Sequence, residues 1–256
     1  GMLFKIAAVP FHFWAPDVYE GSPALTTALM STLAKVVAMA TLYKLLSVMN
    51  ADISETYKMV IVAIAMASMT VGNIMALKQT NVKRMLAFSG ISHAGFMLMT
   101  LLSLANSASS LLYYTTAYAL SGIAAFSVIL YVCKNQHNED ITNFHGLGKT
   151  HPFLAAVLTA SLLSMAGIPI FAGFFAKLVL FTQTIENGYL ALVLVAVINS
   201  IISVGYYFKL ILAMYTKESN EERSGKPILI YAVAFTAITL NIIIGLFPSL
   251  VLDLLG

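Results

Sequence analysis

The chain has 256 residues, of which 59% are hydrophobic and 10% are charged, and its formal net charge is +3. Soluble domains carry about 25% charged residues, so this composition excludes an ordinary soluble domain and favours a membrane protein. The single cysteine, Cys133, excludes an intrachain disulfide and an iron–sulfur cluster held by this chain alone.

Long uncharged runs separated by polar clusters predict membrane-spanning helices, because a bilayer core of about 30 Å requires about 20 apolar residues. The runs are too long for barrel strands, which have about 10 residues of alternating polarity. We therefore expect an all-α polytopic transmembrane helical bundle with one partial span and seven complete ones. In chain order these are 1–13 (partial), 24–49, 58–78, 85–104, 110–133, 152–184, 189–216 and 227–252.

The first residues already lie within an apolar run, which lacks the charged start and the cleavage site of a secretory signal. This pattern is typical of a span whose earlier half is absent. Residues 1–256 are therefore expected to be the C-terminal part of one longer membrane domain, with N-terminal spans missing.

The span 152–184 is too long for one crossing, and Gly167, Pro169 and Gly173 lie at its centre. Proline removes a backbone donor and clashes with the preceding turn, so we expect a broken helix near Pro169. Irregular backbone at membrane depth requires protein or a wet cavity around it. The partial span repeats the pattern, because Pro10 follows Lys5, and a second break is expected near Pro10.

Three lysines stand inside apolar runs: Lys5, Lys35 and Lys177. A lysine at the centre of a membrane helix costs about 2.5 to 3.5 kcal/mol on insertion scales, so each is expected to have a use. Lys35 and Lys177 are about ten residues, or 15 Å, from an interface, which one side chain cannot reach. A lysine removed from bulk water can take up and release a proton, which favours a relay. Lysines expected to extend to the interface instead are Lys44, Lys58 and Lys209.

Several other polar residues can be interpreted in two ways. Ser89, Ser92 and His93 have helical spacing and could line a route of proton uptake, although His93 could equally be an interhelical hydrogen bonder. His12 and Trp14 could belong to a relay or to a membrane-interface turn. The remaining histidines, His137, His145 and His151, do not have the spacing of a metal site, so no metal is expected.

Lysine and arginine gather in alternate loops, and cytoplasmic loops retain such an excess. Loops 78–84, 134–151 and 217–226 are therefore expected in the cytoplasm, with the turn 14–23 on the same side and the C-terminus outside. This asymmetry explains the net charge without nucleic acid. At that end, the carboxylates of Asp17 and Glu20 could pair with Lys83 or Arg84 or could remain solvated.

Several stretches resemble one known family. They are FKIAAVPFHFWAPDVYEGSP, TLAKVVA, NIMALKQTNVKRMLAFSGISHAGFML and SMAGIPIFAGFFAKLVLF. They are similar to subunit N of bacterial proton-pumping NADH:quinone oxidoreductase, respiratory complex I, and the resemblance covers essentially the whole chain. The turn reads W-A-P-D-V-Y-E-G, as in that subunit, whereas related antiporter-like subunits read W-L-P-D-A.

The resemblance implies spans 7 to 14 of a fourteen-span protein of the antiporter-like proton-channel type. It implies proton-relay roles for Lys5, Lys35 and Lys177, with a partner glutamate for Lys5 on a span that this sequence does not contain. Where a related subunit has a lysine, this chain has the polar stretch 115–121. A connecting path would therefore run through water, Thr115 or Ser121, or through the hydroxyls of Thr116 and Tyr118.

The chain contains no nucleotide-binding glycine motif, so no redox site is expected in it. The resemblance implies that NADH, FMN, iron–sulfur clusters and quinone bind partner subunits of complex I, and that this chain moves protons in the bacterial inner membrane. Two alternatives remain open: a subunit of a cation/proton antiporter, and a structural scaffold whose lysines bind lipid headgroups or partner carboxylates.

Overall fold

The computed structural model describes residues 1–49, 55–104, 106–134, 136, 138–218 and 228–254. Over these residues every regular element is a helix, apart from one isolated bridge between Asn81 and Asp140. The elements are α1 (Met2–Lys5), α2 (Trp14–Gly21), α3 (Ala24–Leu29), η1 (Met30–Ala34), α4 (Lys35–Val48), α5 (Glu55–Leu77), α6 (Val82–Leu98), η2 (Met99–Leu102), α7 (Ala108–Val132), η3 (Ile141–Phe144), α8 (Leu147–Thr150), α9 (Pro152–Ala166), α10 (Ala172–Glu186), α11 (Leu190–Thr216), α12 (Ile228–Leu246) and α13 (Ser249–Leu252).

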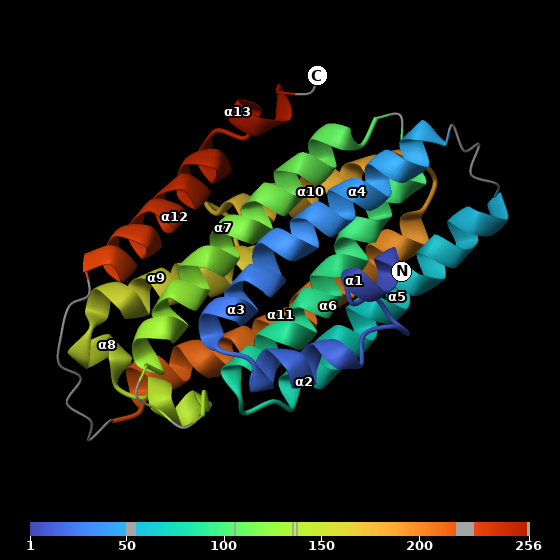
Figure 1. Ribbon diagram of the computed structural model, residues 1–256. Helices are drawn as coiled ribbons and strands as arrows, with labels where there is room; N and C mark the ends of the chain where they lie inside the picture. Colours follow the sequence, from blue (N-terminus) through green and yellow to red (C-terminus); the bar gives the residue numbers. More distant parts are fainter. Residues whose placement is uncertain (50–54, 105, 135, 137, 219–227, 255–256) are drawn as a thin grey trace.

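The long helices run side by side as a bundle (Figure 1), which confirms the expected fold class. Within the described residues, six continuous helical segments are long and apolar enough to cross a membrane. They are Ala24–Val48, Glu55–Leu77, Val82–Leu102, Ala108–Val132, Leu190–Thr216 and Ile228–Leu246. The remaining complete span expected from the sequence, 152–184, consists of α9 and α10 with an interruption around Pro169, as the sequence predicts.

The N-terminal region agrees with the expectation at Pro10 and differs from it after Pro10. The partial span 1–13 has the single helical turn α1 before non-helical backbone around Pro10, as the sequence predicts, whereas the turn expected at 14–23 contains the helix α2. Aromatic contacts hold the start of α2 against α1: the Trp14 ring stacks on Phe4 at 5.4 Å and its Nε1 donates to the Phe4 carbonyl at 3.0 Å. Tyr19 is buried, so α2 packs against the bundle and is not a solvated turn.

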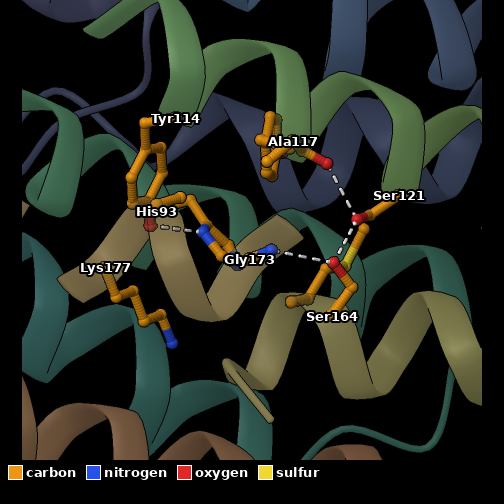
Figure 2. Close-up of a pocket in the computed structure, with 10 residues that line it drawn as sticks. His93, Tyr114, Ala117, Ser121, Ser164, Gly173 and Lys177 are labelled. Carbon is orange, nitrogen blue, oxygen red and sulfur yellow. Dashed lines mark hydrogen bonds between the residues drawn. The ribbon is translucent and has the colours of Figure 1, made fainter. Parts of the chain in front are cut away.

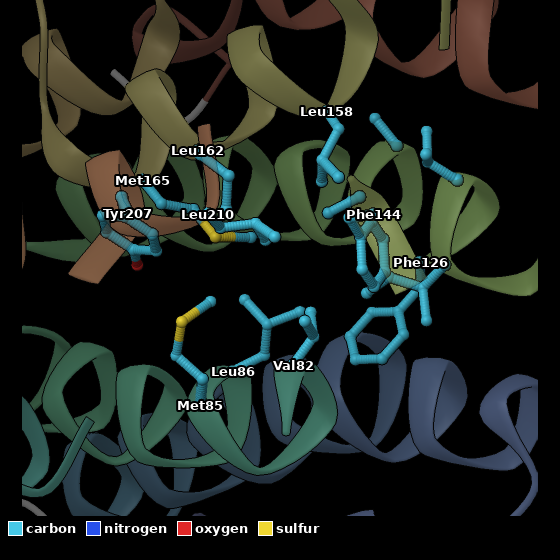
Figure 3. Close-up of a cluster of buried hydrophobic side chains, with 14 of the residues drawn as sticks. Val82, Met85, Leu86, Phe126, Phe144, Leu158, Leu162, Met165, Tyr207 and Leu210 are labelled. Carbon is cyan, nitrogen blue, oxygen red and sulfur yellow. The ribbon is translucent and has the colours of Figure 1, made fainter. Parts of the chain in front are cut away.

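Helix α6 lies at the centre of the bundle. Every residue of the most apolar stretch within Val82–Leu102 is buried inside the chain. Val82, Met85 and Leu86 face side chains of α9 and α11 across the core (Figure 3). Helix α5 approaches α6 very closely, because a Cβ atom at Gly72 would lie 2.7 Å from the Phe88 carbonyl oxygen. The side chains of α6 are therefore fixed by packing on all sides.

The loops that the charge pattern assigns to one side meet at one end of the bundle. Arg84 binds Asp17 at 2.6 Å and Glu20 at 2.8 Å, so the expected pairing at this end is confirmed for Arg84. Lys83, the other candidate, instead binds Glu139 at 2.8 Å and donates to the Ser22 carbonyl at 2.7 Å.

Lys149 reaches Glu218 at 3.1 Å, which brings the start of loop 217–226 to the same end. Residues 219–226 of that loop lie outside the described residues. Around the other end of the bundle, Lys44 is exposed and Lys58 pairs with Glu55 at 2.8 Å, as expected of lysines near a span end.

Candidate functional site

Lys177 lies on the first turns of α10, beside the interruption that separates it from α9. Gly167 (φ 89°) ends α9 in the left-handed conformation, which glycine adopts without strain. The last carbonyl groups of a helix lack partners in their own helix. Lys177 Nζ donates to one of them, the Ala166 oxygen, at 2.8 Å, and also lies 5.0 Å from the centre of the Phe96 ring. The break thus supplies a buried acceptor for a buried cation.

Lys35 follows a widened helical turn. The residues before it, Met30–Ala34, form a π-helical turn, a feature that often occurs at functional sites. Its side chain is 2% exposed, and no hydrogen-bond acceptor for Nζ occurs among the described residues. Its Nζ lies over the ring of Tyr19, 6.0 Å from the ring centre. Lys35 is thus the less well satisfied of the two buried lysines.

His93 on α6 lines the same small cavity as Lys177 and contacts Tyr118, whose hydroxyl lies beside the Lys35 ammonium. Its Nδ1 is 2.8 Å from the Tyr114 hydroxyl, and its Nε2 is 3.3 Å from the Tyr207 hydroxyl. The imidazole also lies against Tyr118, with ring centres 4.8 Å apart. Ser89 extends the network, with its hydroxyl 2.5 Å from that of Tyr207. Both ring nitrogens therefore have partners that can donate or accept a proton.

A small cavity of about 10 Å³ lies between His93 and Lys177, which is enough for about one water molecule. Figure 2 shows Ser121 of α7 and Ser164 of α9 on its wall, with hydroxyl oxygens 3.0 Å apart. The Ser164 hydroxyl also accepts from the Gly173 amide at 3.2 Å, so the two half-helices are joined across the break. Polar groups thus line the cavity between His93 and the first turn of α10.

Lys177 also lines a second space in the protein. A groove of about 280 Å³ between α10 and α11 is lined by Lys177, Ser200 and apolar side chains such as Phe181 and Ile201. The Ser200 hydroxyl lies buried without a hydrogen-bond partner in the described part of the chain. Lys177 therefore stands between an internal cavity and a lateral groove.

The structure brings together some of the residues selected from the sequence but not all. Lys35, His93, Ser121 and Lys177 gather at the centre of the bundle. Lys5 is exposed, and its side chain makes no hydrogen bond or ion pair to any described residue. Thr115 is buried, but its hydroxyl donates to Leu111 of its own helix at 2.8 Å.

The two prolines, Pro10 and Pro169, are both exposed and act through the backbone rather than through contacts in the site. The sequence reasoning did not single out Tyr114, Ser164 or Tyr207. Three different helices contribute these hydroxyls, and no local pattern marks them as neighbours of His93.

No carboxylate pairs with Lys35 or Lys177 among the described residues. The five ion pairs formed there involve Lys58, Lys83, Arg84 (twice) and Lys149, all near helix ends. No cluster of three or more His, Cys, Asp or Glu side chains suited to a metal occurs in the described ranges either. His151 contacts Tyr131 at 2.6 Å, His145 lies in the loop at the charged end, and His137 is outside the described residues.

Comparison with known proteins agrees with this architecture. Residues 1–203 match the family model described as NADH:quinone oxidoreductase/Mrp antiporter, transmembrane. The chain is 77% identical over its whole length to NADH-quinone oxidoreductase subunit N of Flavobacterium johnsoniae, and 45% identical over 98% of its length to the subunit N of Cytophaga hutchinsonii. It covers 57% and 55% of these relatives, so it spans about half the length of the curated relatives it matches.

Among solved structures, a chain of respiratory complex I from Thermus thermophilus superposes with a TM-score of 0.88 at 33% identity, covering 99% of this chain and 56% of that one. A chain of the Mrp complex from a Dietzia species has a TM-score of 0.87 at 22% identity over 98% of this chain and 56% of that one, which shows a shared fold. The expected resemblance is thus confirmed, and the chain belongs to the NADH:quinone oxidoreductase/Mrp antiporter family of transmembrane proteins.

Proposed function

We propose that the chain is part of a proton-translocating membrane subunit of NADH:quinone oxidoreductase, and that Lys35, His93 and Lys177 carry protons through its centre. The observation that supports this most directly is the position of His93: both of its ring nitrogens contact tyrosine hydroxyls, between two buried lysines that have no carboxylate partner in the described chain. Buried ionisable residues in membrane spans are expensive and typically functional.

The proposed path has a defined order of groups. A proton held by Lys35 passes toward the Tyr118 hydroxyl and His93, since Lys35 and Tyr118 both lie beside Gly90 of α6 and the Tyr118 ring lies against His93. From His93 it crosses the cavity to Lys177, with one water or the Ser121 and Ser164 hydroxyls as the link. Lys177 then releases it toward the groove beside Ser200. Each transfer needs a group that both binds and gives up a proton, which lysine, histidine and water do.

In this proposal Lys5 acts as a switch at the start of the path. Its exposed position is compatible with a partner carboxylate supplied by another segment or subunit. The interrupted backbone around Pro10 and Pro169 supplies polar carbonyl groups at membrane depth, while Thr115 acts only by supporting its helix. NADH, FMN, iron–sulfur clusters and quinone would bind partner subunits, which would carry out the redox chemistry.

We further propose that the protein is embedded in the bacterial inner membrane beside other complex I membrane subunits. Loops 78–84, 134–151 and 217–226 would face the cytoplasm, because the lysines and arginines gather in these loops. The C-terminus would lie outside. The names of the relatives support this assignment, since the curated relatives compared are subunits N.

The test uses the full-length protein in its native complex. Lys35→Ala and Lys177→Ala should each leave the complex assembled but lower NADH-driven proton pumping in membrane vesicles by at least about tenfold, since a positioned proton-transfer group typically contributes about a hundredfold or more. Normal pumping by either assembled variant would refute the relay. If the purified protein instead exchanged sodium or potassium for protons without NADH oxidation, the antiporter alternative would replace this proposal.

A further inference from the structure

Two glycines face the buried lysines directly. A Cβ atom built on Gly90 of α6 would lie 2.6 Å from Lys35 Nζ and 3.1 Å from the Tyr118 hydroxyl. A Cβ atom on Gly167 would lie 2.9 Å from Cδ and 3.3 Å from Nζ of Lys177. Non-bonded atoms prefer separations of about 3.5 to 4.0 Å, so each lysine occupies space that any other residue at the glycine would fill.

Close helix packing does not explain Gly90. Glycines that let two helices approach have the backbone of the neighbouring helix against them, as Gly72 has Phe88 and Gly95 has Ala65. At Gly90 the nearest atoms are instead the ends of two polar side chains, the Lys35 ammonium and the Tyr118 hydroxyl. The missing side chain therefore makes room for these groups and not for a helix.

We propose that Gly90 is the positioning residue of Lys35: it keeps open the space in which the ammonium group lies beside Tyr118 and His93. The widened turn Met30–Ala34 brings Lys35 to the wall of α6, and Gly90 is the point on that wall where the ammonium fits. Gly167 has the same relationship to Lys177, but its positive φ of 89° would strain any replacement, so Gly90 is the clean site to test. The proposal rests on the proposed relay role of Lys35.

The expected effect of Gly90→Ala follows from the geometry. The added methyl group must displace the ammonium by about 1 Å to restore normal contact, and a misplacement of that size can lower the rate of a positioned reaction by about a hundredfold. We expect NADH-driven proton pumping by the assembled complex to fall between about tenfold and a hundredfold. The control is Gly205→Ala on α11, whose methyl meets only the flexible end of Leu77 at 3.0 Å, and it should pump normally.

A second measurement separates positioning from packing. Thermal stability of the purified complex is compared for Gly90→Ala, Lys35→Ala and the double variant. If Gly90 acts through Lys35, Gly90→Ala lowers the melting temperature more when Lys35 is present than in the Lys35→Ala background, where only the Tyr118 hydroxyl, 3.1 Å away, remains close to the new methyl group. Equal losses in both backgrounds would overturn the proposal, and so would normal pumping by Gly90→Ala beside an inactive Lys35→Ala.

The outcomes distinguish the two proposals. Normal pumping by Lys35→Ala would refute the relay role of Lys35 on which the positioning role depends. An inactive Lys35→Ala together with a Gly90→Ala effect that is smaller in the double variant supports both. The stability comparison does not depend on NADH oxidation, so the contact itself is tested even if the relay fails.

Discussion

The Lys177 ammonium and the Ala166 carbonyl oxygen are 2.8 Å apart, so a buried cation closes the end of the helix that precedes the break. The hydrogen bond joins the side chain of one half-helix to the backbone of the other. Protonation at this position therefore affects the contact between α9 and α10, because a neutral amine is a weaker donor than an ammonium group.

Replacing Lys177 by arginine tests whether the charge or the proton matters. Guanidinium keeps the positive charge and can still donate to Ala166, but it does not deprotonate in proteins. We expect Lys177→Arg to assemble and yet to pump at least about tenfold more slowly in vesicles containing a pH-sensitive dye. Pumping at the wild-type rate would show that Lys177 serves only as a fixed charge.

Replacing His93 by glutamine separates hydrogen bonding from proton transfer. Glutamine can bond to Tyr114 and Tyr207 but cannot exchange a proton at neutral pH, so we expect a loss of pumping of at least about tenfold with assembly intact. His145→Gln, in the loop at the charged end, is the matched control and should pump normally. Equal activity of the two variants would remove His93 from the path.

The charged end gives a prediction on stability alone. Glu139→Gln leaves the Lys83 ammonium, whose side chain is 3% exposed, without its counter-charge, which should cost about 3 kcal/mol. Glu218→Gln breaks the exposed pair with Lys149 and should cost less than about 0.5 kcal/mol. Thermal unfolding of the detergent-solubilised protein measures both, and a similar melting temperature for the two variants would contradict the prediction.

Close packing of α5 on α6 gives a further test. In Gly72→Ala the new methyl group lies 2.7 Å from backbone atoms of Phe88 and Ser92, which cannot rotate away. Forcing the helices apart should cost about 1 to 3 kcal/mol of unfolding free energy. Gly21→Ala, at the end of α2 where no atom lies within 4 Å, should unfold like the wild type. A Gly72→Ala protein as stable as Gly21→Ala would show that the helices can separate without loss.

The sequence alone predicted the all-helical fold, the order of the long apolar helices and the interruption in the run that contains Pro169. These features depend on properties of a short stretch of chain: the length of an apolar run and the missing amide of proline. The burial of Lys35 and Lys177 followed in the same way, since both lie too far from a span end for their side chains to reach it.

Contacts between spans were decided by the tertiary structure. Tyr114 and Tyr207 meet His93 from two different helices, and that meeting depends on how each helix is rotated in the bundle. The widened turn before Lys35 changes that rotation locally, and hydrophobic periodicity does not reveal it. Lys5 depends on such contacts as well, because its side chain is exposed in this chain and its expected partner carboxylate belongs to another segment or subunit. Partition into a membrane is a property of a segment, whereas a proton path requires side chains of several segments to meet.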